Sequence, residues 1–114
     1  MTLARLNVDA GDTDGAIELL ERRQASARDD PQYHALLGAL LLRVRRYEDA
    51  VQHYLVALRS DPANVSWLVG VGVAFEGVGN LANATEAYRR ADDSAGLSPE
   101  TAKFLAERLA RISR

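Results

Sequence analysis

The feature that most restricts the fold of this chain is a repeat, because residues of the same kind recur 34 positions apart. A faint copy begins upstream, where Ala16 and Leu20 lie one such period before Ala50 and Tyr54. Sequence periods of this length are typical of chains built from stacked units, each of which packs on its neighbours. We therefore expect a repeat array rather than one globular core. The clearest matched pairs are Leu37 with Val71, Gly38 with Gly72, Leu41 with Phe75, Ala50 with Ala84, Tyr54 with Tyr88, and Ala57 with Ala91.

Each repeat divides into two segments in which apolar residues follow helical spacing, so the sequence predicts an all-α fold. Asp30-Pro31 and Ser98-Pro99 each place an N-cap residue before a proline suited to the first helical position. Asn80 can cap the helix that it precedes. The turns within each pair are short, which makes the paired helices antiparallel neighbours. The predicted helices span residues 2–10, 13–28, 31–44, 47–59, 64–77, 81–94 and 99–112.

Two glycines stand in the middle of predicted helices, where glycine costs about 1 kcal/mol relative to alanine. That cost is tolerable where another helix crosses at close range. In the first clear repeat we expect Gly38 to face Ala50, with Tyr54 filling the wider gap one turn along. The same arrangement is expected in the next repeat for Gly72, Ala84 and Tyr88.

Charge and composition exclude several classes of partner. The chain has 14 basic and 16 acidic side chains, a formal net charge of −2 and no cysteine. Such a balance offers no basic face for nucleic acid. The lack of cysteine excludes disulfides and thiolate metal sites. The longest apolar run, Ala35 to Leu42, is far shorter than the roughly 20 residues of a membrane span, so this segment is not expected to insert into a membrane.

No residue pattern indicates catalysis, a cofactor or a metal. The only histidines, His34 and His53, lie on different predicted helices and match no metal-binding spacing. Gly70-Val71-Gly72 lies inside a predicted helix rather than after a strand, so it is not a phosphate-binding loop. We therefore expect a protein that is not an enzyme and that holds no cofactor or metal.

The recurring small and aromatic residues resemble the signature of the tetratricopeptide repeat family. The aromatic residue that the family has early in the first helix is displaced here by one position, to Tyr33 and Trp67, and Arg23 stands where the upstream unit should have alanine. The resemblance implies a right-handed superhelical stack of antiparallel helix pairs with a C-terminal capping helix. It divides a single domain, 1–114, into a degenerate repeat at 1–30, repeats at 31–64 and 65–98, and the cap at 99–114. The matching residues are Gly38, Ala50, Tyr54, Ala57 and Pro62, then Gly72, Phe75, Ala84, Tyr88 and Ala91.

The capping helix is predicted to be amphipathic, with one face turned to the array and the other to solvent. Phe104, Leu105, Leu109 and Ile112 form its apolar stripe. Lys103, Glu107, Arg108 and Arg111 form its solvent face.

In this family the first helix of each pair lines a concave groove, so the resemblance also implies a binding surface. Two interpretations stay open for its apolar members: plain burial against neighbouring helices, or a trough that accepts a peptide, an amphipathic helix or another copy of the chain. Groove positions Ala35, Ala39 and Val69 carry no cations, which argues against the acidic-tail binding of some co-chaperones in the family. The groove residues implied are Gln32, Ala35, Ala39, Leu42, Ser66, Val69, Val73 and Glu76.

The run from Trp67 to Asn80, followed by Ala87–Ala91 and Leu97–Leu109, is similar to the C-terminal repeats of MSHA pilus biogenesis proteins of the MshN type. That similarity implies a periplasmic domain of a membrane-anchored bacterial protein that helps to assemble a type IV pilus or secretion machine. We also expect a fragment of a longer protein, because Met1 is the only methionine and the chain opens in the middle of the repeat pattern. The alternative is a cytoplasmic sensing or regulatory arm of a larger signalling protein or enzyme.

Overall fold

The computed structural model describes residues 13–23 and 29–113, and this part of the chain contains six helices and no strand. The prediction of an all-α fold is confirmed. Every helix from α4 onward begins within one position of its predicted start. The helices are α2 (Thr13–Glu21), α4 (Pro31–Arg43), α5 (Tyr47–Ser60), α6 (Val65–Gly77), α7 (Leu81–Asp92) and α8 (Pro99–Ile112).

The N-terminal region differs from the prediction. The helix expected at 2–10 lies outside the described residues, as does the 24–28 part of the helix expected at 13–28. The predicted extent of that second helix is wrong, because α2 ends at Glu21 and a turn follows. The backbone N–H of Arg23 donates to the Leu20 carbonyl, three residues earlier, at 2.9 Å. This tighter hydrogen bond ends the helix.

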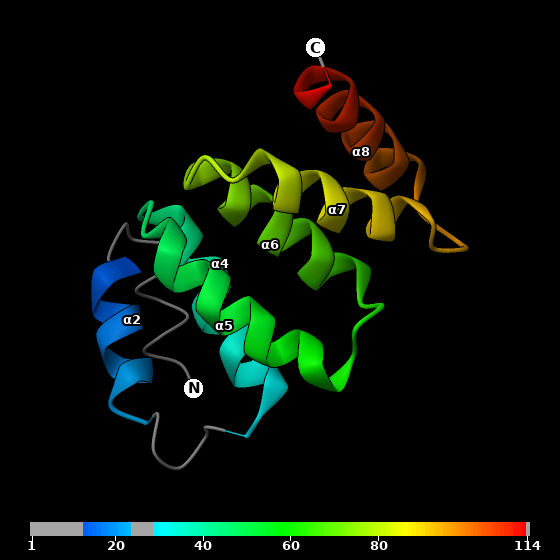
Figure 1. Ribbon diagram of the computed structural model, residues 1–114. Coiled ribbons are helices and arrows are strands. Elements are labelled where there is room, and N and C mark those ends of the chain that lie inside the picture. Colours follow the sequence, from blue (N-terminus) through cyan, green and yellow to red (C-terminus); the bar gives the residue numbers. More distant parts are fainter. Residues whose placement is uncertain (1–12, 24–28, 114) are drawn as a thin grey trace.

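The helices stack in chain order, as Figure 1 shows from α2 at one end to α8 at the other. Helices α4 and α5 form one antiparallel pair and α6 and α7 the next, while α5 packs on α6 and α7 on α8. Tyr33 ties the first pair to α2, because its hydroxyl donates to the Leu20 carbonyl at 2.7 Å. None of the described helices combines the length and apolar character needed to cross a membrane.

Local signals in the sequence set the helix starts. The Asp30 carboxylate accepts from the Gln32 N–H at 3.0 Å, and the Ser98 hydroxyl accepts from the Thr101 N–H at 3.1 Å. Asn80 caps α7 in the same way. The predicted caps therefore satisfy backbone donors that have no partner inside the helix.

The packing of the first glycine is different from the prediction. Gly38 faces the ring of Tyr54 rather than Ala50: a Cβ at Gly38 would lie 2.9 Å from two ring atoms of Tyr54. The far end of the same ring meets α6, where a Cβ at Gly70 would lie 2.6 Å from the hydroxyl oxygen. Ala50 is fully buried in the core. A flat ring can lie across a helix only where no Cβ projects, so Tyr54 joins one repeat to the next through two glycines.

The second glycine repeats this arrangement. Gly72 faces Tyr88 rather than Ala84, since a Cβ there would lie 2.7 Å from Cδ1 of the Tyr88 ring. Tyr88 is fully buried, and its ring meets that of Phe104 on α8 edge-on, with centroids 6.1 Å apart. Tyr54 and Tyr88 therefore occupy equivalent positions in successive repeats, and each connects its own helix pair to the next first helix.

Candidate functional site

The groove residues implied by the sequence lie on α4 and α6, with unequal access to solvent. On α4, Gln32 and Ala39 are exposed, Ala35 is only 8% exposed, and Leu42 packs partly buried against the core. Ala35 is thus buried against neighbouring helices, whereas Leu42 keeps part of its surface open to solvent. The other four lie on α6: Ser66 is exposed, and Val69, Val73 and Glu76 are half-buried.

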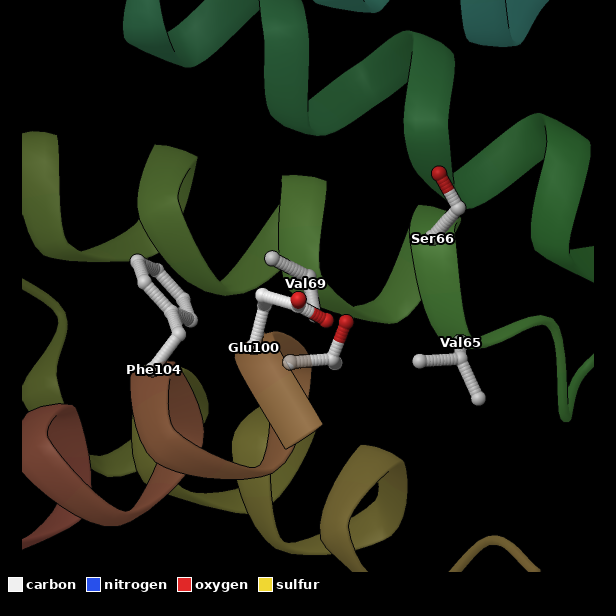
Figure 2. A pocket seen from close by; sticks show the side chains of 6 residues that line it. Val65, Ser66, Val69, Glu100 and Phe104 are labelled. Carbon is white, nitrogen blue, oxygen red and sulfur yellow. The ribbon is translucent and has the colours of Figure 1, made fainter. Parts of the chain in front are cut away.

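A hollow of about 480 Å³ opens between α6 and the start of α8. Figure 2 shows its walls, with Val69 and Ser66 on α6 and with Glu100 and Phe104 reaching from α8. This volume lies within the range of about 300–1,000 Å³ found for pockets that bind small molecules. The structure thus brings together two implied groove residues with others that the groove prediction did not include. The complete lining is Val65, Ser66, Val69, Glu100, Thr101 and Phe104.

The hollow coincides with two breaks in the repeat pattern. Tyr33 and Trp67 occupy the same position in successive repeats and are both buried aromatic residues, but the next position in this series is Thr101. The shorter threonine leaves open space at the hollow that it lines. The repeat spacing could have indicated this difference, because the change from aromatic residue to threonine is visible in the sequence.

The second break in the repeat pattern affects how closely the first helices of successive repeats approach one another. Gly70 lets the Tyr54 ring reach the backbone of α6, but the equivalent residue one repeat later is Phe104. Phe104 meets the next tyrosine, Tyr88, with its own ring. The bulky side chain prevents the close approach that a glycine allows, and α4 and α6 are in closer contact than α6 and α8. The wider gap at α8 follows from a residue that the sequence already shows.

Glu76, implied as a polar end of the groove, is held inside the protein by α7 and α8. Its Oε1 accepts from the Tyr88 hydroxyl at 2.5 Å and from Arg108 at 2.9 Å, and its Oε2 accepts from Arg111 at 3.3 Å. Arg108 also lies over the Phe104 ring, 4.9 Å from its centroid. The predicted solvent face of α8 is therefore only partly correct, because the half-buried carboxylate draws the guanidinium groups of Arg108 and Arg111 toward α6.

The environment of the tyrosines keeps them neutral. Burial raises the pKa of Tyr54 to about 12. Burial, together with the hydrogen bond to Glu76, raises the pKa of Tyr88 further above its usual value. Neither phenol is therefore suited to act as a general base near neutral pH.

The two histidines meet between α4 and α5, where His34 is buried and His53 is half-buried. Their Nδ1 atoms are 3.0 Å apart and their rings stack with centroids 5.3 Å apart. Burial and the neighbouring His34 lower the pKa of His53, against the opposing effect of Asp49 and Glu21. In the described residues, no group of three or more His, Asp or Glu side chains is placed to hold a metal ion.

Comparison with known proteins identifies the repeat. A family model of the tetratricopeptide repeat matches residues 1–65 and, a second time, residues 36–99. The chain belongs to the tetratricopeptide repeat family. No curated protein sequence matched it.

Solved structures of tetratricopeptide repeat (TPR) proteins share this fold. PcrH, in complex with the chaperone binding region of PopD, has a TM-score of 0.84 and is 21% identical, with 97% of this chain and 86% of PcrH covered. The type III secretion translocator chaperone SycD of Yersinia enterocolitica has a TM-score of 0.85 at 17% identity, with 98% and 79% covered. The second TPR domain of human RPAP3, in complex with an HSP70 peptide, has a TM-score of 0.81 at 18% identity, with 97% and 89% covered.

Because these sequence identities are low, the similarities show a common fold alone. They confirm the predicted TPR stack of antiparallel helix pairs. The narrower resemblance to pilus biogenesis proteins of the MshN type is not confirmed by these comparisons.

Proposed function

We propose that this TPR chain is a non-catalytic interaction module that binds a peptide or helical segment of another protein along the face formed by α4, α6 and α8. The observation that carries the proposal is the hollow between α6 and α8, where half-buried Val69 and Phe104 leave apolar surface open to solvent. Apolar surface that is concave and rimmed by polar groups favours a partner's side chain over water.

Three neighbouring TPR structures support a peptide ligand at the level of the fold. PcrH was solved with a region of PopD, SycD with a peptide of the translocator YopD, and RPAP3 with an HSP70 peptide. Acidic-tail binding is not proposed for this chain, since Ala35, Ala39 and Val69 offer no cation at the groove positions noted above. The apolar hollow favours an anchor side chain instead.

The test is a selection of peptides from a phage-displayed random library on the intact chain. Affinities of selected peptides would be measured by fluorescence anisotropy for the wild type and for Ser66→Arg, which places a long side chain at the mouth of the hollow. Leu55→Arg on α5 is the matched control, because Leu55 is also exposed and lies away from the hollow. Circular dichroism would verify that both variants fold.

We expect Ser66→Arg to weaken binding at least about tenfold, because burying one aliphatic or aromatic anchor contributes roughly 1.5–3 kcal/mol. Leu55→Arg should bind as the wild type does. Peptides that bind both variants equally, or that lose affinity only with Leu55→Arg, would contradict the proposed site.

We further propose a setting in bacterial pilus or secretion assembly, with the domain in the periplasm. The support is the sequence similarity to MshN-type repeats, together with the type III secretion chaperone SycD among the structural neighbours. Sequencing the gene upstream tests this. A membrane span there agrees with the proposal, whereas a kinase, transferase or helix-turn-helix region favours the alternative of a cytoplasmic regulatory arm.

A further inference from the structure

The hollow lies where the repeat pattern lacks one of its own aromatic side chains. In the two preceding repeats this position is filled by Tyr33 and Trp67, each less than a tenth exposed. At the third, Thr101 is half-buried, and its hydroxyl is already engaged by that of Ser98 at 2.9 Å. The shorter threonine leaves space beside it, and that space has the size of a site for a ring, with Val65, Val69 and Phe104 in its walls.

Phe104 supplies a second wall that suits an aromatic guest. Its ring already packs edge-on against Tyr88, and aromatic pairs prefer such tilted or offset arrangements. Phe104 is half-buried, and part of its surface lines the hollow with Val69. A ring entering from solvent would thus contact one aromatic side chain and the two valines of the lining, Val65 and Val69.

Glu100 gives the hollow a negative charge at its rim. It is exposed on the first turn of α8, and Figure 2 shows its side chain directed toward α6. Among the described residues, no arginine or lysine lies within ion-pair distance of Glu100, not even Lys103 on the same helix. The acidic groove residue Glu76, in contrast, is already paired with two arginines. Glu100 is therefore the acidic group at this site that remains available to a partner.

We propose that the hollow between α6 and α8 binds an aromatic side chain of a partner peptide, with a lysine or arginine beside it paired to Glu100. The inference rests on the proposed function and specifies the chemistry of its ligand. The partner's ring takes the place that Tyr33 and Trp67 occupy in the preceding repeats, and its basic neighbour completes the charge at the rim.

The experiment uses a library-selected peptide that contains an aromatic residue, in two synthetic forms that differ only in lysine or glutamate beside the ring. Affinities are measured for the wild type, for Thr101→Trp, which fills the hollow as Trp67 does one repeat earlier, and for Glu100→Gln. The matched control is Glu107→Gln, because Glu107 is also exposed on α8 and does not line the hollow. Melting curves establish that each variant is folded.

The wild type and Glu107→Gln should favour the lysine form about two- to five-fold, as expected for an exposed ion pair. Glu100→Gln should remove this preference without abolishing binding, and Thr101→Trp should weaken both forms at least about tenfold. If Thr101→Trp does not fold, the Glu100→Gln comparison still decides the question of charge.

The two proposals fail in different ways. This inference would be overturned, with the groove kept as the binding site, by one combination of results. Ser66→Arg would weaken peptide binding, but Thr101→Trp would not, and the lysine and glutamate forms would bind equally well. Peptides indifferent to all of these variants would overturn the proposed function itself. If Glu100→Gln preferred the lysine form as strongly as the wild type does, the assignment of Glu100 would be overturned, because another acidic group would then select the cation.

Discussion

Replacing Gly72 with leucine should destabilise the array, because the Tyr88 ring occupies the space that a Cβ requires. That Cβ would lie 2.7 Å from Cδ1 of the ring, closer than carbon atoms approach without displacement. The ring has little freedom to yield: Tyr88 is fully buried, and its hydroxyl is held by Glu76 at 2.5 Å. Leucine would therefore force apart α6 and α7, which carry the two residues.

The size of the effect follows from two opposed contributions. Overpacking a buried site typically costs about 1–3 kcal/mol and occasionally more. Removing a glycine from the middle of a helix returns about 1 kcal/mol of helix propensity. Because the buried Tyr88 ring has little room to move, we expect an overpacking cost at the upper end of this range and a net loss of about 2 kcal/mol for Gly72→Leu, with a smaller loss for Gly72→Ala, which adds a single carbon. For a chain of this size a loss of about 2 kcal/mol lowers the melting temperature by roughly 8 °C.

The assay is thermal and urea unfolding followed by far-ultraviolet circular dichroism, which reports helix content. Ala106→Leu is the matched control, because Ala106 occupies the same repeat position as Gly72, one repeat later, and is exposed. Its stability should change by no more than about 0.5 kcal/mol. If Gly72→Leu unfolded at the wild-type temperature, the close packing of tyrosine on glycine would be refuted as a determinant of this fold.

Three further predictions concern the elements around the site. Glu76→Gln should lower the free energy of unfolding by about 1–3 kcal/mol in urea titrations, because the Tyr88 hydroxyl and two arginines lose a charged acceptor; an unchanged midpoint would count against this cluster. Stability should fall as the pH drops below about 6.5, because the lowered pKa of His53 lets the unfolded chain bind a proton that the folded chain does not. His53→Gln should flatten that slope between about pH 7 and pH 5.5, and a slope unaltered in this variant would assign the effect to other groups. Ser98→Ala should cost about 0.5–2 kcal/mol by removing the cap of α8, measured by the same unfolding curves; a wild-type value would mean that water replaces the cap.

Most of the fold was predictable because the information is local and repeated. Helix starts such as Pro31 and Pro99 follow from a capping side chain and a proline, and neither depends on distant contacts. Recurrence at a constant period then fixes how the pairs stack. The exception is α2, where the upstream repeat is weakest and the helix ends before the predicted position.

The contacts between helices were less predictable, for a physical reason. Spacing places Gly38, Ala50 and Tyr54 close together but leaves open the small rotation of each helix that decides which side chain covers the glycine. Rotation is set by the packing of the whole core, so the ring rather than the alanine faces Gly38. The pairing of Glu76 with α8 also depends on an inter-helix distance that sequence spacing alone does not give.

The hollow between α6 and α8 was partly predictable from the sequence. Its α6 wall was implied by family resemblance through Ser66 and Val69, whereas its α8 wall was assigned to a capping helix and not considered as a surface. Extending the repeat comparison by one more period would have placed Thr101 and Phe104 against Trp67 and Gly70. Those differences in side-chain size indicate the positions at which α8 departs from the pattern of the preceding repeats.

Hydrogen–deuterium exchange with and without a saturating library-selected peptide shows whether a partner segment binds the face formed by α4, α6 and α8. We expect such binding to slow amide exchange in α6 and in the first turns of α8, with α5 and α7 changing less. Protection confined to α5 and α7, with exchange around Val69 and Phe104 unaltered, would contradict it.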